Sequence, residues 1–459
     1  MTEPGASALE RAHSRRDASL SQLREFLRIP SISCERSRSG DVAAAAEWLA
    51  ERLRALGAER VTVYPTGCHP IVYGEVLTAG RGSPTVLIYG HYDVQPVSAL
   101  DDWETDPFDP TITGNELRAR GASDNKGPMI ACIAAVEAVL HAGPMPVNVK
   151  FLFEGEEEIG SVHFREFLED HRDLCGCDLV LNPDVGMLGE QSPTIFYGLR
   201  GMYRCRLRVT GPSRDLHSGG YGGIVENPIH VLSALVAGMH DGGGRITLPG
   251  FYDAVREMSE EERSEMATLP RNEADYLAQS GAPQLWGEEE YLPAEREGAR
   301  PALDVIEMRA GSEKAAIPAG ASAIITVRLV PDQLPESVHA GLEAYLEEHA
   351  PPTVRWEITE WSGFPALLTD RASPGVRAMA DAMKAVWETD PLFYRSGGSI
   401  AAVGYLKEIL GVDSLLTGFS LPDDRVHGPN EKLHVPSWER GTDAVIHFLY
   451  SLANELRTD

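Results

Sequence analysis

Residues 85–91, Thr-Val-Leu-Ile-Tyr-Gly-His, begin with the kind of short apolar run that decides the fold of this chain. Comparable runs stand at 147–153 (VNVKFLF), 178–181 (DLVL) and 414–417 (SLLT), and each precedes a polar, glycine-containing turn and a helical pattern. Short apolar runs bounded by turns are typical of strands buried on both faces. Their alternation with helices predicts an α/β fold with a mostly parallel sheet covered by helices.

A different pattern begins near residue 198. Polar and apolar residues alternate at 204–211, 322–331 and 353–361, as they do in half-solvated antiparallel strands. We therefore predict an α+β domain at 199–367, inserted into a first domain formed by 1–198 and 368–459. Helical patterns lie at 20–27, 43–56, 129–140, 227–238 and 375–387.

The composition disfavours several classes of function. The chain has 69 acidic and 41 basic side chains, a net charge of -28, which disfavours binding to nucleic acid or to anionic membranes. Six cysteines in 459 residues form no dense disulfide framework, so we expect reduced thiols. The first residues contain no apolar stretch, and no window contains 18 apolar residues, so we expect a cytoplasmic protein.

Imidazoles and carboxylates follow the predicted strands. In an open α/β sheet, ligands bind beyond the carboxyl ends of the strands, so these side chains should meet at one rim. They are His91 and Asp93 after the first run, Glu156, Glu157 and Glu158 after the second, Asp184 after the third, His427 in the loop after the fourth, and Asp124 in the loop that opens the helix at 129–140.

Each residue alone has an ordinary structural explanation. A histidine beside a strand is usually hydrogen-bonded in the core, three consecutive glutamates usually form a solvated face, Asp124 could cap a helix, and Asp184 could belong to a turn. Carboxylates gathered at one rim would repel one another unless cations lay between them. Histidine and carboxylate ligands without cysteine suit zinc, or less specifically manganese or cobalt.

Longer motifs resemble those of a known family. The HxDxxP of 91–96, the GxSDxKG of 121–127 and the EGxEExGS of 154–161 resemble the zinc aminoacyl-hydrolase metallopeptidases, which include carnosinase, cytosolic nonspecific dipeptidase, aminoacylase and acetylornithine deacetylase. The segments 103–108 (WETDPF), 215–223 (DLHSGGYGG) and 427–431 (HGPNE) look like signatures of the dipeptidase branch. The resemblance implies a zinc-peptidase-like catalytic domain and an inserted lid or dimerisation domain.

The resemblance also implies a pair of zinc ions. His91 and Asp184 would hold one ion, Glu158 and His427 the other, and Asp124 would bridge them. It further implies a cis peptide bond between Asp124 and Asn125. His91 and Asp93 are two residues apart in an extended segment, so their side chains lean the same way and Asp93 can accept the other imidazole N–H.

Catalytic roles follow from the same resemblance. Glu157 would be the general base that takes a proton from a water between the metals and later protonates the leaving amine. His217 would stabilise the oxyanion from the second domain of a partner subunit, which implies a homodimer; otherwise it is a residue of a glycine-rich loop. Arg328 matches a carboxylate-binding arginine, although it could be a strand-surface residue, and Gly398 and Ser399 match a loop that offers backbone N–H groups.

The expected function is therefore metal-dependent hydrolysis of the amide bond in dipeptides or small peptides with a free carboxylate. The alternative within hydrolases is an N-acyl-amino-acid deacylase of the aminoacylase or acetylornithine deacetylase type. A non-catalytic metal-binding protein would not need Glu157. A two-metal phosphoesterase would need a phosphate cradle or a basic cluster, and the predicted rim has neither.

Overall fold

A computed structural model describes residues 3–97, 100–311 and 316–456. The chain forms two compact units: the first comprises Met1–Tyr197, Thr369–Tyr394 and Ile400–Asp459, and the second comprises Gly198–Leu368 and Arg395–Ser399. The segment 395–399 stands within the range 368–459 that is predicted for the first domain. This segment lies in the second unit because Arg395 pairs there with Glu262 at 2.5 Å, and the carbonyl of Gly398 accepts the backbone N–H of Arg200.

The sheet of the first unit contains all four predicted strands. They are β6 (Asn148–Glu154), β3 (Thr85–His91), β7 (Leu179–Asn182) and β17 (Ser414–Thr417), adjacent in that order and parallel. Antiparallel strands extend the sheet on both sides, so the whole sheet is mixed. The flanking strands are β1 (Glu59–Tyr64) and β2 (Ile71–Val76) on one side, and β8 (Thr194–Leu199) with β15 (Leu367–Leu368) and β16 (Leu392–Ser396) on the other.

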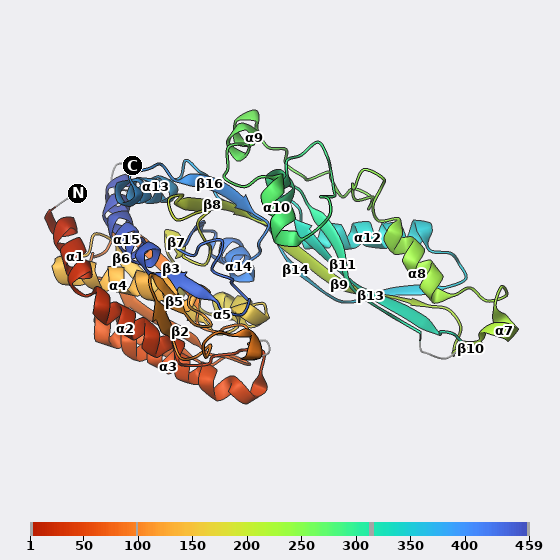
Figure 1. Ribbon diagram of the computed structural model, residues 1–459, viewed down its shortest axis with the longest axis horizontal. Coiled ribbons are helices and arrows are strands. Elements are labelled where there is room, and N and C mark those ends of the chain that lie inside the picture. The colour runs from red at the N-terminus through yellow and green to blue at the C-terminus, as the bar shows by residue number, and fades with distance from the viewer. Residues whose placement is uncertain (1–2, 98–99, 312–315, 457–459) are drawn as a thin grey trace. The chain divides into compact units, whose positions relative to one another are not determined.

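Helices bury both faces of this sheet (Figure 1), which explains why its central strands are mostly apolar. Val86 and Ile88 pack into the core on one face, whereas Leu87 and Tyr89 pack into the core on the other. The first face carries α1 (Glu3–Ser14), α2 (Arg16–Leu27), α3 (Ser39–Leu56), α4 (Lys126–Ala142), α13 (Pro374–Trp387) and α15 (Val435–Glu455). The second face carries α5 (Phe164–Asp170), α6 (Arg172–Cys175) and α14 (Ala401–Leu410).

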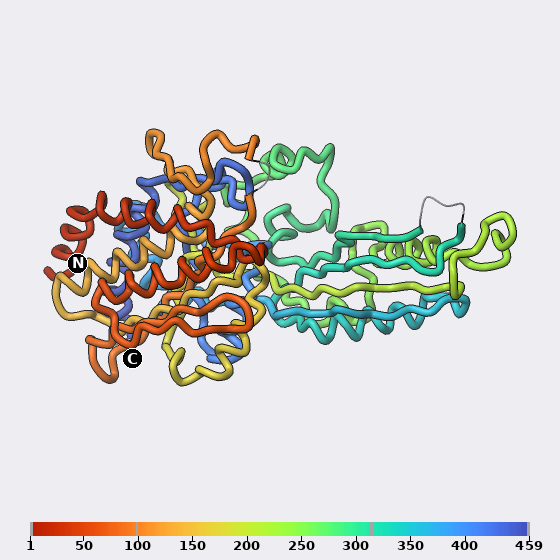
Figure 2. Tube along the Cα trace, turned by 90° about the horizontal axis from the view of Figure 1, so that it is seen from below, coloured from red at the N-terminus to blue at the C-terminus, as the bar shows by residue number. Residues whose placement is uncertain are grey.

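The five helices expected from periodicity are confirmed as α2, α3, α4, α8 (Pro228–Ala237) and α13. The first helix, α1, was not expected; it lies at the red end of the trace in Figure 2. Its only buried apolar side chain is Ala8, and Leu9 is its only large apolar residue, so its sequence contains no pronounced apolar stripe. It forms against α4 and α15, a contact that local sequence does not encode. Among the described residues, no helix is both long and apolar enough to cross a bilayer.

Short elements hold the loops at the carboxyl ends of the parallel strands. A small antiparallel sheet joins β4 (Thr111–Thr113), β5 (Glu116–Arg118) and β18 (Lys432–His434). The 3-10 helix η3 (Glu157–Ile159) follows β6, while η1 (Arg36–Arg38) and η2 (Leu100–Asp102) lie elsewhere in this unit.

The second unit is an antiparallel sheet with its own core. Its strand order is β11 (Ala302–Ala310), β13 (Gly320–Leu329), β9 (Gly201–Thr210) and β14 (Arg355–Phe364). The helices α8 and α12 (Pro335–His349) pack on it, as Figure 1 shows. A two-stranded ladder of β10 (Leu216–His217) and β12 (Ala316–Ile317), the turn α7 (Ser218–Tyr221), and α9 (Glu260–Met266), α10 (Glu273–Ser280) and α11 (Pro293–Gly298) complete the unit.

Candidate metal centre

Five predicted ligands come from different parts of the first unit. His91 ends β3, Asp184 follows β7, Glu158 lies in η3 after β6, Asp124 precedes α4, and His427 lies in the loop before β18. Because β3, β6 and β7 are parallel, their carboxyl ends meet at one edge of the sheet. The fold therefore brings together residues that are far apart in the chain.

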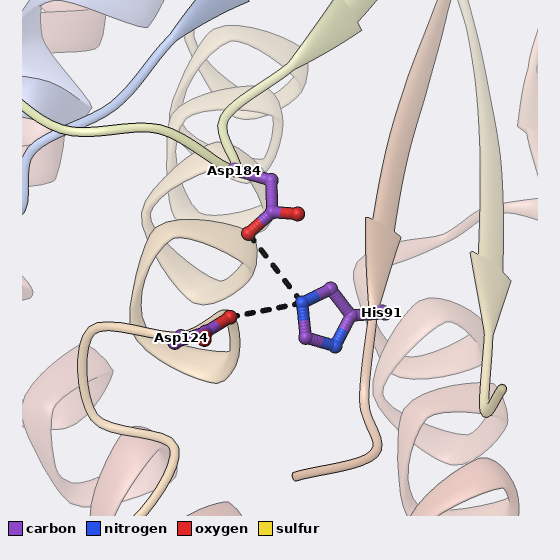
Figure 3. Close-up of side chains that lie close together, drawn as sticks. All are labelled: His91, Asp124 and Asp184. Atoms are coloured by element: carbon purple, nitrogen blue, oxygen red, sulfur yellow. Dashed lines mark hydrogen bonds and ion pairs between the residues drawn. The ribbon is translucent and has the colours of Figure 1, made fainter. Parts of the chain in front are cut away.

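The first group is buried and centres on an imidazole. Nε2 of His91 lies 3.0 Å from Oδ1 of Asp124 and 3.4 Å from Oδ1 of Asp184, and the His91 side chain is fully buried. Figure 3 shows both carboxylates directed at the same ring nitrogen. The three ligand atoms lie within 4.8 Å of one another, which suits a shared cation.

The second group uses the other oxygen of Asp124. Nε2 of His427 lies 2.7 Å from Oδ2 of Asp124 and 3.2 Å from Oε2 of Glu158. The ligand atoms of these three residues also lie within 4.8 Å of one another. Asp124 thus directs one oxygen to each group, as a carboxylate that bridges two ions would. The donor set, imidazole nitrogens and carboxylate oxygens, fits a pair of zinc ions.

The loop around Asp124 depends on two glycines. Gly121 has φ of +85°, a conformation that disfavours residues with a side chain. At Gly127 a Cβ would lie 2.1 Å from the carbonyl oxygen of Ala122, so only glycine lets the loop fold back onto α4. The Asp124–Asn125 peptide bond is cis, as expected.

Electrostatic coupling in the centre is strong. Burial raises the pKa of Asp184 to about 6, although His91 opposes this shift. Burial also raises the pKa of Asp124, but hydrogen bonds from His427 and His91 outweigh it and hold its pKa below the usual range. Hydrogen bonds to Asp124 and Glu158 raise the pKa of His427 to about 10. A cluster of this kind favours positive charge between its carboxylates.

Glu157 lies beside the two groups without belonging to either. Burial raises the pKa of its carboxyl well above the usual range; His91 opposes the shift, and the charges of Asp184, Glu158 and Asp124 reinforce it. A raised pKa in a glutamate next to a metal site suits proton transfer.

Asp93 positions its neighbours in a way that sequence reasoning captured only in part. Its carboxylate accepts the backbone N–H groups of Glu157 at 3.2 Å and Glu158 at 3.1 Å. Nδ1 of His91 lies 3.4 Å from Oδ1 of Asp93 but only 3.1 Å from the Asp93 carbonyl oxygen. Asp93 therefore joins the loop after β3 to the loop after β6, besides orienting the imidazole.

Two supporting amides were missed. The side chain of Gln95 donates to Oε2 of Glu158 at 2.8 Å, and that of Asn125 donates to Oδ1 of Asp184 at 2.8 Å. Both stand inside the quoted motifs, so their positions were visible in the sequence. Their partners were not, because each reaches a ligand on another loop.

The remaining predicted residues lie in the second unit. His217 ends β10 with an exposed side chain, and β10 pairs with β12. Nη1 of Arg328, in β13, donates to Oγ of Ser399 at 2.8 Å, so two predicted substrate-binding residues are in contact. The backbone N–H of Gly398 donates to Oγ of Ser396 at 3.1 Å, and so already has a partner within its own loop.

Comparison with known proteins identifies the family. The model of peptidase family M20/M25/M40 matches residues 87–451, most of the chain. The chain belongs to this family. It is 30% identical to the Cys-Gly metallodipeptidase of Candida albicans over 94% of each protein. It is also similar to the probable di- and tripeptidase of Saccharomyces cerevisiae, at 27% identity over 95% of this chain, and spans 51% of that relative's length.

A solved structure agrees with the family membership. The metallo-carboxypeptidase of this family from Sulfolobus solfataricus superposes with a TM-score of 0.85 and 31% identity, covering 95% of this chain and 99% of that one. The fold class is thereby confirmed, and the chain is a metallopeptidase. Because the matched Candida relative is a metallodipeptidase, the resemblance to the dipeptidase branch is also confirmed. The centre described above is a possible metal site of this enzyme.

Proposed function

We propose that the protein cleaves the amide bond of dipeptides or small peptides with a free carboxylate, using two zinc ions per chain. The carrying observation is that Asp124 directs one oxygen to the His91–Asp184 group and the other to the Glu158–His427 group. The relatives support the substrate class, since one is named a Cys-Gly metallodipeptidase and another a metallo-carboxypeptidase. Manganese or cobalt would satisfy the same donors.

Two bound ions would polarise the substrate carbonyl and make an attacking water more acidic. Glu157 accepts the proton of that water on its carboxylate and then delivers it to the leaving amine. The raised pKa of Glu157 supports this role, because a carboxyl of ordinary pKa is a weaker proton acceptor. Asp93 keeps Glu157 in place through its contact with the Glu157 backbone.

The second unit supplies substrate recognition in this proposal. Arg328 pairs with the free carboxylate of the substrate, and Ser399, its hydrogen-bond partner, orients the guanidinium with the help of the Gly398 loop. His217 donates a hydrogen bond to the developing oxyanion in the active site of a partner subunit. In this proposal residues 199–367 form the lid and dimerisation domain, and the remainder of the chain forms the catalytic domain. The enzyme works as a homodimer in the cytoplasm.

A substrate panel tests the proposal. The purified chain is stripped of metal, supplied with zinc or manganese, and assayed on Cys-Gly and other dipeptides, on the same dipeptides with an amidated carboxyl end, and on N-acetyl amino acids. Hydrolysis of the free dipeptides alone supports the proposal. Faster cleavage of N-acetyl amino acids would instead show an N-acyl-amino-acid deacylase, and equal rates on amidated dipeptides would remove the requirement for a carboxylate.

A further inference from the structure

A buried carboxylate outside the ligand set holds the loop that carries Asp124. Glu431 is fully buried, and its Oε1 accepts the backbone N–H groups of Ser123 at 3.0 Å and Asp124 at 3.1 Å. Its Oε2 accepts the backbone N–H of Gly121 at 3.1 Å and Nη1 of Arg120 at 2.7 Å. Four donors thus converge on one side chain. Burial raises the pKa of Glu431 to about 7, which Arg120 opposes.

Arg120, which donates to Glu431, also contacts two further loops. Arg120 is 1% exposed and lies with its guanidinium 5.3 Å from the ring centre of Trp103. Its Nη2 donates to the carbonyl oxygen of Pro96 and to that of His427, each at 3.3 Å. Pro96 ends the motif that begins at His91, so the guanidinium of Arg120, which itself belongs to the Asp124 loop, contacts the loops of two further metal ligands.

The loop that carries His427 needs contacts of this kind more than the strand end that carries His91 does. The His427 side chain is 54% exposed, whereas that of His91 is fully buried at the end of a central strand. Arg425, His427 and Asn430 all have positive φ, a conformation that side chains disfavour and that surrounding contacts must maintain.

We propose that Arg120 and Glu431 are positioning residues for one of the two ions: the pair holds the His427 loop against the Asp124 loop and so sets the site formed with Glu158. The site formed by His91 and Asp184 depends on the pair less, because the sheet places its ligands. This inference rests on the two-ion centre of the proposed function. It predicts that breaking the pair weakens the ion at Glu158 and His427 more than the ion at His91 and Asp184.

Two variants and one control test the pair. Glu431→Gln removes the negative charge and keeps one oxygen that accepts from the loop amides. Arg120→Lys keeps the positive charge but loses the guanidinium nitrogens that donate to the Pro96 and His427 carbonyls. Glu137→Gln is the matched control, since Glu137 pairs with Arg52 between α3 and α4. The variants should fold, because Oγ of Ser123 still donates to Asp424 at 2.7 Å and β5 still pairs with β18. Circular dichroism checks this, and if Glu431→Gln does not fold, Arg120→Lys decides.

Zinc binding is measured without substrate, by dialysis against buffered zinc and elemental analysis, and the spectrum of the cobalt-loaded chain is recorded. We expect one ion to bind about 10–100-fold more weakly in both variants, the range typical of residues that orient metal ligands. The affinity for the second ion should fall less, and the control should bind both ions as the wild type does. At limiting zinc the variants should lose kcat with little change in KM, and excess zinc should restore kcat.

Combined variants show which ion is affected. Adding Glu431→Gln to His427→Ala should cost no further affinity, because both changes affect the same ion, whereas it should add to the loss caused by Asp184→Ala. Three results would overturn the inference. The variants could weaken the binding of both ions equally, they could leave both affinities unchanged, or the loss caused by Glu431→Gln could add to that caused by His427→Ala. A wild-type chain that binds two ions but cleaves no dipeptide would contradict the proposed function and leave the inference intact. A wild-type chain that binds no pair of ions would overturn both.

Discussion

Nε2 of His427 lies 2.7 Å from Oδ2 of Asp124, while Oδ1 of the same carboxylate lies 3.0 Å from His91. One aspartate therefore belongs to two groups of ligands that come from separate loops. If both groups hold ions, substitution of Asp124 must disturb both, and substitution of either histidine must disturb one more than the other.

Metal content is the first prediction. The purified protein should bind about two divalent ions per chain, and Asp124→Ala should bind neither tightly, because each ion loses a ligand. Chelation should abolish hydrolysis, and added zinc or manganese should restore it. Elemental analysis beside the activity assay provides the check. Full activity in protein shown to be free of metal would contradict the whole assignment.

The glutamate triplet gives the second prediction. Glu157→Gln should retain both ions and lose roughly 10²–10⁴ in kcat, because it removes a general base that is not a ligand. Glu158→Gln should also weaken metal binding, since Oε2 of Glu158 faces His427. Calorimetric zinc titration of the two variants separates these effects. The reverse order would shift the assignment by one residue.

Assembly gives the third prediction. If His217 acts in a partner's active site, His217→Ala should lower kcat by about 10²–10³ at unchanged metal content, the usual cost of losing an oxyanion donor. Mixing His217→Ala with Glu157→Gln subunits should restore part of the activity, because one site of a mixed dimer has both residues intact. One variant is tagged so that subunit exchange can be verified. Mixed dimers that form and stay inactive would place the function of His217 within its own chain.

Arg328 gives the fourth prediction. Arg328→Lys should raise KM for free dipeptides and change kcat less, because an ammonium cannot pair with a carboxylate through two parallel hydrogen bonds. Ser399→Ala should have a smaller effect in the same direction, as it removes only the group that accepts from Arg328. Steady-state kinetics on free and amidated dipeptides measure both. An Arg328→Lys enzyme with unaltered KM would rule out this carboxylate contact.

Glu154 gives a prediction about pH. Burial raises its pKa to about 8, against hydrogen bonds from Tyr89 and Ser161, and its Oε2 has no hydrogen-bond partner among the described residues. The folded chain then keeps a proton that the unfolded chain releases. The unfolding free energy of the metal-free protein should therefore fall as the pH rises from about 4.5 to about 8, by at most about 1.4 kcal/mol per pH unit from this group.

Replacement of this carboxyl by an amide isolates the effect. Glu154→Gln should remove this part of the pH dependence, because an amide does not titrate in this range. Denaturant unfolding at several pH values, with chelator present, measures the difference. An unchanged pH profile would mean that Glu154 is ionised in the folded protein.

Local patterns were enough to locate the strands and the ligand-bearing loops. The run at 86–89 is hydrophobic at every position because its side chains enter two cores, and His91 follows because the strand ends at the site. The same signal was absent for α1, where one small apolar side chain is buried. No local pattern links 395–399 to the second unit, because its partners Glu262 and Arg200 lie far away in the sequence.

The sequence by itself determined which chemistry is available, because the imidazoles, the carboxylates and their order along the chain are fixed by its covalent structure. Only the tertiary structure decided how they work together. It directs the two oxygens of Asp124 to different groups, gives Asp93 the amides of Glu157 and Glu158, and places Glu431 under the Asp124 loop. The physical reason is that hydrogen bonds and charge coupling depend on distances of a few ångströms. Those distances are set when distant segments pack together, and no local pattern of residues contains them.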